Sequence, residues 1–109
     1  MVKVASCQYV ISLFDSWEAY AAHLESLAAE AAGAGAQLLL LPEYAAMTLA
    51  GLLPEDERGE LARSIAGIQP LLPRWLALSQ DIARRHGVYF CPGSAPVLDA
   101  DGRYRNRAF

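Results

Sequence analysis

Four consecutive leucines, Leu38 to Leu41, restrict the possible fold of this 109-residue sequence more than any other feature. The run lies in residues 37–41, shows no alternation of apolar and polar side chains, and ends abruptly at Pro42 and Glu43. Such a pattern is typical of a strand that is covered on both faces, as in a parallel sheet. The sequence therefore predicts a buried parallel strand here.

A strand and a helix are expected before this run. Residues 2–10 are rich in β-branched and apolar side chains and predict a first strand. Residues 15–18 contain an N-cap type residue with a glutamate three positions later, and apolar side chains then recur at helical spacing until Gly33 and Gly35 end the pattern. Strand, helix and strand make a right-handed βαβ unit, whose two parallel strands point their carboxyl ends to one edge of the sheet.

Further elements are expected after this unit. We predict a short helix over residues 54–65, a longer helix over 70–86, a third strand over 88–91, and a hairpin of 96–98 with 103–109 at the margin of the sheet. The fold class is α/β, with no internal repeat and no domain boundary. We interpret residues 1–109 as an incomplete N-terminal part of a single domain, because the leucine strand needs cover on two faces and these helices can cover one.

Composition and charge exclude several classes of protein. The chain is 54% hydrophobic and 19% charged with a net charge of -3, which fits a globular domain and gives no basic surface for nucleic acid or for an anionic membrane. Signal-peptide features and long apolar runs are absent, so a cytoplasmic location is expected. Cys7 and Cys91 lie in strand-like stretches without a close second thiol or histidine, so we expect two small buried side chains and neither a metal site nor a disulfide.

Glu43 is the first candidate for chemistry, because ligands in α/β sheets bind at the carboxyl ends of strands and Glu43 directly follows the most buried one. From position alone, a solvated loop carboxylate is the simpler interpretation. Tyr44 and Met47 come next and could line a substrate pocket, although ordinary packing under a loop is the simpler interpretation. Among these residues we select Glu43 as a catalytic candidate and Tyr44 as a substrate-binding candidate.

The remaining charged residues are explained by ordinary structural roles. His86 lies in the last turn of a predicted helix, where it can interact with terminal carbonyl groups. Alternate positions on the last strand predict one solvated basic face, formed by Arg103, Arg105 and Arg107. Residues 33–35 end a helix and do not link a strand to a helix N-terminus, so neither a phosphate loop nor a nucleotide cofactor is expected.

Several motifs in order resemble the opening of nitrilase-superfamily enzymes, which are carbon-nitrogen hydrolases. They are Val4-Ala5-Ser6-Cys7-Gln8, the capped helix, Leu38-Leu39-Leu40-Leu41-Pro42-Glu43-Tyr44, residues 70–93, and an Asn-Arg-Ala-Phe segment after an Asp-Gly turn in residues 101–109. The resemblance spans the whole chain. It implies part of an α-β-β-α sandwich, a homo-oligomer, and a small-molecule amide, nitrile or carbamoyl substrate.

The same resemblance assigns one role in this chain. The family uses a cysteine, a glutamate and a lysine, and the glutamate after the apolar strand, here Glu43, is its general base. The family's lysine and nucleophilic cysteine lie further along the chain than Phe109 corresponds to, so neither Cys7 nor Cys91 inherits the role of nucleophile. The single lysine, Lys3, is expected at the opposite edge of the sheet. We therefore expect residues 1–109 alone to be inactive.

A function of another class remains open. The chain could be a non-catalytic α/β module that binds a small molecule or a protein and uses Glu43 as a hydrogen-bonding carboxylate. A lysine and a cysteine that each follow a strand further along the protein would favour the enzyme.

Overall fold

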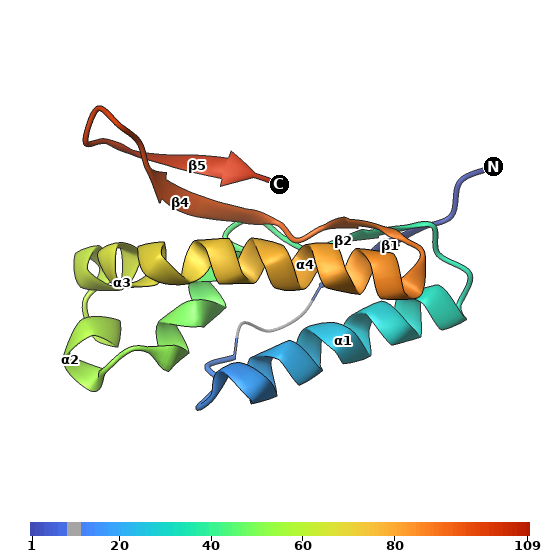
Figure 1. The fold of residues 1–109 in the computed structure, drawn as a ribbon, viewed down its shortest axis with the longest axis horizontal. Helices are drawn as coiled ribbons and strands as arrows, with labels where there is room; N and C mark the ends of the chain where they lie inside the picture. The colour runs from blue at the N-terminus through green and yellow to red at the C-terminus, as the bar shows by residue number, and fades with distance from the viewer. Residues whose placement is uncertain (9–11) are drawn as a thin grey trace.

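A computed structural model describes residues 1–8 and 12–109 and has an α/β fold, in which a small parallel sheet packs on helices and leads into a β-hairpin (Figure 1). The elements in chain order are β1 (Val4–Ser6), α1 (Trp17–Gly33), β2 (Leu38–Leu40), the 3-10 helix η1 (Ala45–Leu52), α2 (Glu55–Arg58), α3 (Leu61–Ile68), the 3-10 helix η2 (Gln69–Leu71), α4 (Leu72–His86), β3 (Tyr89–Cys91), β4 (Ser94–Leu98) and β5 (Tyr104–Ala108). β1 is shorter than the strand predicted over residues 2–10, and residues 9–11 lie outside the described residues.

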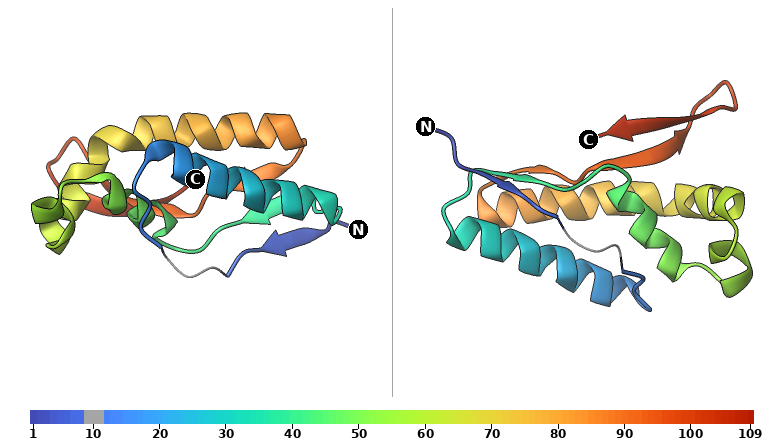
Figure 2. Two further views of the ribbon diagram at one scale, coloured as in Figure 1. Left: turned by 90° about the horizontal axis from the view of Figure 1, so that it is seen from below. Right: turned by 180° about the vertical axis from the view of Figure 1, so that it is seen from behind.

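The sheet has the strand order β1-β2-β3, and both pairs are parallel, as the βαβ prediction required. Ala5, Leu39 and Phe90 are paired across the three strands and form the row that faces the helices. Figure 2 shows α1 and α4 side by side on this one face of the sheet. Because all three strands are parallel, their carboxyl ends lie at the same edge of the sheet.

The leucine strand is covered on one face within the described residues. Leu39 and Leu41 are buried against the helices, whereas the side chain of Leu40 is 39% exposed on the opposite face. Val4 and Tyr89, the partners of Leu38 on the two neighbouring strands, are also exposed on that open face. The cover that the unbroken leucine run predicts for this second face is not supplied by the described part of the chain.

Two helices, α1 and α4, supply much of the core. The Oγ atom of Ser16 caps α1 by accepting a 3.1 Å hydrogen bond from the backbone N–H of Ala19, within the segment where the sequence predicted a cap. Side chains at helical spacing then form one buried stripe on each helix, and burial of each large apolar member contributes about 1.5–3 kcal/mol. The buried residues of the two stripes are Tyr20, Leu24, Ala28 and Ala31 in α1, and Leu72, Trp75, Ser79 and Ile82 in α4.

The segment between β2 and α4 differs from the prediction. A single helix was predicted over residues 54–65, but α2 ends at Gly59 and a separate helix, α3, follows. The side chain of Glu60 accepts hydrogen bonds from the backbone N–H groups of Ala62 and Arg63, so it caps a new helix instead of continuing the old one. The sequence also gave no signal for η1, whose turns begin directly after Tyr44.

The turn after β3 lies directly against the turn after β2. Gly93 has a φ of +89°, and a Cβ atom added to it would lie 2.2 Å from the carbonyl oxygen of Pro42 and 2.8 Å from the Cβ of Ala45. The chain then continues into β4, which pairs with β5 in a two-stranded antiparallel sheet of its own, not at the margin of the parallel sheet. The hairpin rises beyond α3 on the same side of the helices as the parallel sheet (Figure 1).

The contact at Gly93 gives a test of this arrangement. We expect Gly93→Ala to lower the free energy of unfolding by at least about 2 kcal/mol more than Gly102→Ala. Gly102 is a matched control, because it also has a positive φ (+79°) but an added Cβ would contact nothing within 4 Å. Urea denaturation of both variants followed by circular dichroism measures the difference, and equal losses would show that the two turns do not meet as described.

Candidate active site

Glu43 lies at the carboxyl edge of the parallel sheet, directly after Pro42 at the end of the β2 segment. It lines a cavity of about 480 Å³ together with Cys91, Ser94 and Asn106. Cys91 is the last residue of the neighbouring strand β3, so the parallel pairing brings both side chains to one cavity. This is the edge at which α/β sheets bind ligands.

Asn106 holds the carboxylate of Glu43. Its Nδ2 atom donates a 2.7 Å hydrogen bond to Oε1 of Glu43 across 63 residues of sequence. In the sequence, Asn106 stands out only as part of the Asn-Arg-Ala-Phe segment, and the pattern predicted no role for it. The available signal was the alternation along β5, which places Asn106 on the opposite face of the strand from Arg105 and Arg107.

The backbone of Tyr44 directs the chain away from the sheet. Tyr44 has φ 57° and ψ 23°, a left-handed conformation that is uncommon for a residue with a side chain. Its backbone N–H donates a 2.8 Å hydrogen bond to Oγ of the buried Ser94, which supports this conformation from the neighbouring turn. The Tyr44 side chain lines a second cavity, of about 510 Å³, and Asn106 lies between the two cavities because it lines both.

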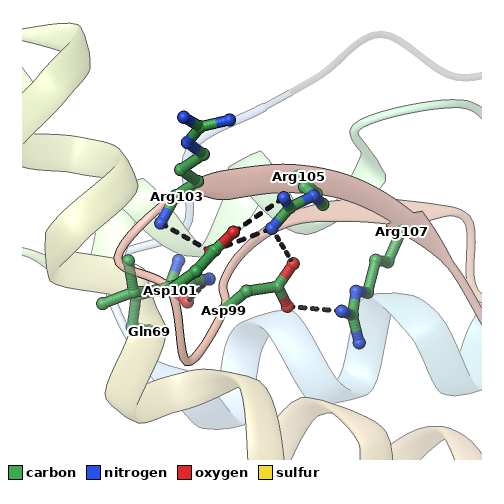
Figure 3. Close-up of polar contacts among 7 residues, drawn as sticks. Gln69, Asp99, Asp101, Arg103, Arg105 and Arg107 are labelled. Carbon is green, nitrogen blue, oxygen red and sulfur yellow. Dashed lines mark hydrogen bonds and ion pairs between the residues drawn. The ribbon is translucent and has the colours of Figure 1, made fainter.

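Ion pairs at the tip of the hairpin fix the strand that carries Asn106 (Figure 3). Arg105 lies between two carboxylates, with Nη1 2.6 Å from Oδ2 of Asp99 and Nη2 2.8 Å from Oδ2 of Asp101. Arg107 also pairs with Asp99, whereas the Arg103 side chain points away from the carboxylates. The predicted basic face of β5 is thus exposed, but two of its three arginines are ion-paired. The hydrogen bonds from Arg105 hold the pKa of Asp99 and of Asp101 below the ordinary range.

Gln69 attaches the other strand of the hairpin to the helices. Its Nε2 atom donates to the carbonyl oxygens of Pro96 (2.7 Å) and Ile65 (2.9 Å), and its Oε1 accepts from the backbone N–H of Leu98 (3.0 Å). One side chain therefore joins α3 to β4. The hairpin is held at both of its strands, and Asn106 is positioned by that attachment.

The other candidate residues lie away from Glu43. Lys3 precedes β1 at the opposite edge of the sheet, as predicted, and its Nζ donates to the carbonyl oxygen of Ala34. Cys7 lines a different cavity beside α1, where burial raises the pKa of its thiol. The sequence suggested that His86 interacts with the carbonyl groups that end α4. In the structure its Nε2 pairs instead with Oε1 of Glu25 on α1.

Neither a metal-binding cluster nor a membrane-spanning helix occurs among the residues that the structure describes. Residues 1–8 and 12–109 contain no group of three or more histidine, cysteine, aspartate or glutamate side chains placed to hold a metal ion. Among the same residues, no helix combines the length and apolar character that crossing a bilayer requires.

Comparison with known proteins gives one match. The sequence profile of the family described as carbon-nitrogen hydrolase matches residues 3–109. No curated protein and no solved structure matches the chain. The match covers all the elements from β1 to β5, including both strand-end turns and the hairpin that bears Asn106.

The hairpin ion pairs predict a difference in acid stability. Because the pKa values of Asp99 and Asp101 are lowered in the folded protein, their pairing stabilises the fold above the ordinary aspartate pKa of about 3.9 and is lost as the pH falls through and below it. Between pH 6 and pH 3, roughly spanning that value, the wild-type protein should therefore lose more stability than the double variant Asp99→Asn/Asp101→Asn. Urea midpoints at each pH measure this.

Asp81→Asn is the control for that comparison, since it removes an exposed ion pair with Arg84 on α4. It should lose stability in parallel with the wild type. A double variant as acid-sensitive as the wild type would mean that the hairpin carboxylates contribute nothing to the pH dependence.

Proposed function

The chain belongs to the carbon-nitrogen hydrolase family, and from this premise we propose that Glu43 is the general base of an enzyme that hydrolyses non-peptide carbon-nitrogen bonds in amide, nitrile or carbamoyl compounds. The observation that carries the proposal is the placement of the Glu43 carboxylate, which lines a cavity at the carboxyl edge of the sheet and is oriented by Asn106. A carboxylate held in this way is arranged to accept and return protons.

The proposed reaction needs two further groups. A cysteine thiol gives its proton to Glu43 and attacks the amide carbon, a lysine ammonium stabilises the oxyanion, and the proton passes to the departing ammonia. Glu43 then takes a proton from water as the water attacks the thioester, and it returns this proton to the departing sulfur, which releases the acid and regenerates the free thiol. We propose that residues 1–109 form the N-terminal part of one such domain and that the lysine and the cysteine come from other parts of the protein. The remote position of Lys3 supports this.

Cys91 is a rival for the role of nucleophile, because it lines the same cavity as Glu43. The family resemblance places the nucleophile further along the chain, and thus assigns Cys91 a packing role. Its backbone carbonyl oxygen accepts a 2.9 Å hydrogen bond from the N–H of Leu41, which continues the pairing of β2 with β3. A single substitution separates the two roles.

We expect Glu43→Gln in the full-length protein to lower kcat by about 10²–10⁴-fold, because the amide cannot accept a proton. Cys91→Ser should keep kcat within about threefold of the wild type, as expected for a packing residue, and Glu18→Gln, on the exposed first turn of α1, controls for loss of a carboxylate. Ammonia release from a panel of amides and nitriles measures all three. Full activity of Glu43→Gln, or loss of activity in Cys91→Ser, would contradict the assignment.

Asn106 should act as a positioning residue for Glu43. Asn106→Ala should lower kcat by about tenfold or more with little change in KM, because it removes a bond that orients the base. Asn106→Asp places a second carboxylate beside Glu43, which opposes ionisation of the pair and should move the acid limb of the pH–rate profile to higher pH. If both variants lose activity without any change in the pH profile, Asn106 has only a structural role.

Absence of turnover would favour the alternative function, that of a non-catalytic module which binds a small molecule or a protein. A non-catalytic binding module would also use the exposed Glu43 carboxylate and its bond to Asn106, but the wild type would then release no ammonia from any member of the panel. The homo-oligomer that the family resemblance implies and the cytoplasmic location that the sequence predicts remain part of the proposal. Light scattering of the full-length protein measures its oligomeric state.

A further inference from the structure

A hollow beside the Glu43 cavity has walls of a different character. It has a volume of about 510 Å³, within the range of about 300–1,000 Å³ typical of ligand pockets. It lies between η1, α3 and the hairpin, and the apolar and aromatic side chains that line it are Tyr44, Met47, Leu61, Ile65, Pro96 and Tyr104. Several of them are exposed large hydrophobic residues, and the Leu61 side chain is 70% exposed. Apolar side chains gathered in one hollow indicate a binding surface.

The hollow offers no free charge. Arg105 is the one charged residue that lines it. Its guanidinium group is already engaged by the carboxylates of Asp99 and Asp101 through three hydrogen bonds. A charged ligand group would have to break this network or lie unpaired against apolar walls, and both cost free energy. The chemistry of the hollow therefore suits an uncharged apolar or aromatic group.

Asn106 connects the hollow to the proposed reaction centre. It lines both cavities and donates its side-chain hydrogen bond to Glu43. A small molecule whose reacting carbon lies near Glu43 can thus extend past Asn106 into the hollow. Tyr44, next to Glu43 in sequence, turns its side chain into that hollow because of its left-handed backbone.

We infer that this hollow, called here the acyl pocket, binds the organic group attached to the carbon of the scissile C–N bond, and that it selects uncharged apolar or aromatic groups. The inference rests on the proposed function for the direction in which the substrate lies. The occupant is a part of the substrate, since the hollow and the Glu43 cavity share Asn106 as a lining residue.

Leu61→Asp tests the acyl pocket with little risk to folding. Leu61 is largely exposed and is the first residue of α3, where an acidic side chain suits the positive end of the helix dipole. In the full-length protein we expect kcat/KM for phenylacetamide to fall by at least about tenfold, because the ring would then lie against a charged side chain instead of an apolar one. The value for acetamide, which has no group to fill the pocket, should stay within about threefold. Leu13→Asp is the matched control, as Leu13 is 57% exposed and lies outside the pocket.

A binding measurement keeps the test independent of turnover. Calorimetry with phenylacetamide on Glu43→Gln, with and without Leu61→Asp, should show at least about tenfold weaker binding for the double variant. Wild-type protein that hydrolyses no amide, together with this loss of binding, would refute the proposed function but support the pocket. The inference would be overturned if Leu61→Asp left the ratio of kcat/KM for phenylacetamide to kcat/KM for acetamide unchanged, whether or not the oligomeric state of the variant changed. It would also be overturned if the wild type preferred succinamate, which carries a carboxylate, to phenylacetamide.

Discussion

The close approach of two strand-end turns underlies the whole site. The carbonyl oxygen of Pro42, after β2, occupies the space in which a side chain at residue 93 would begin, so only glycine fits there. The next residue, Ser94, accepts the N–H of Tyr44 and supports its left-handed backbone. One contact between turns that are fifty residues apart thus sets both the exit direction of the chain after Glu43 and the starting point of β4. The hairpin that follows β3 therefore begins at this contact.

The hairpin that follows this contact carries Asn106, which orients the carboxylate of Glu43. Successive side chains of a strand point to opposite faces, so the face of β5 that carries Arg105 and Arg107 is available for ion pairing while Asn106 points toward Glu43. An exposed ion pair contributes little by itself, because water screens the charges. Here two carboxylates share the arginines in a network, and Gln69 fixes the other strand, so the weak contacts act together on the position of one amide group.

Sequence patterns predicted the parts of the fold that depend on local periodicity. The unbroken leucine run, the helix stripe after Ser16 and the glycine-ended helix before Val88 all led to the observed βαβ topology. Local periodicity could place Asn106 on one face of its strand, but it could not reveal the partner of Asn106, which lies 63 residues away. It also missed the break at Gly59 and Glu60, where a capping carboxylate outweighs helix continuity. The strand direction was enough to predict the place of Glu43 at the sheet edge, whereas its choice as the catalytic residue rested on the family resemblance.

The site separates a polar sheet edge at Glu43 from an apolar surface, and the separation follows from how the chain leaves the sheet. Glu43 still occupies the strand-end position and stays at the carboxyl edge with its exposed carboxylate. One residue later the left-handed turn sends Tyr44 toward α3, away from that edge. Asn106 lies at the boundary and contributes to both sides. In the proposed enzyme, the backbone conformation at this single residue would therefore separate the side chains that act on the substrate chemically from those that recognise its shape.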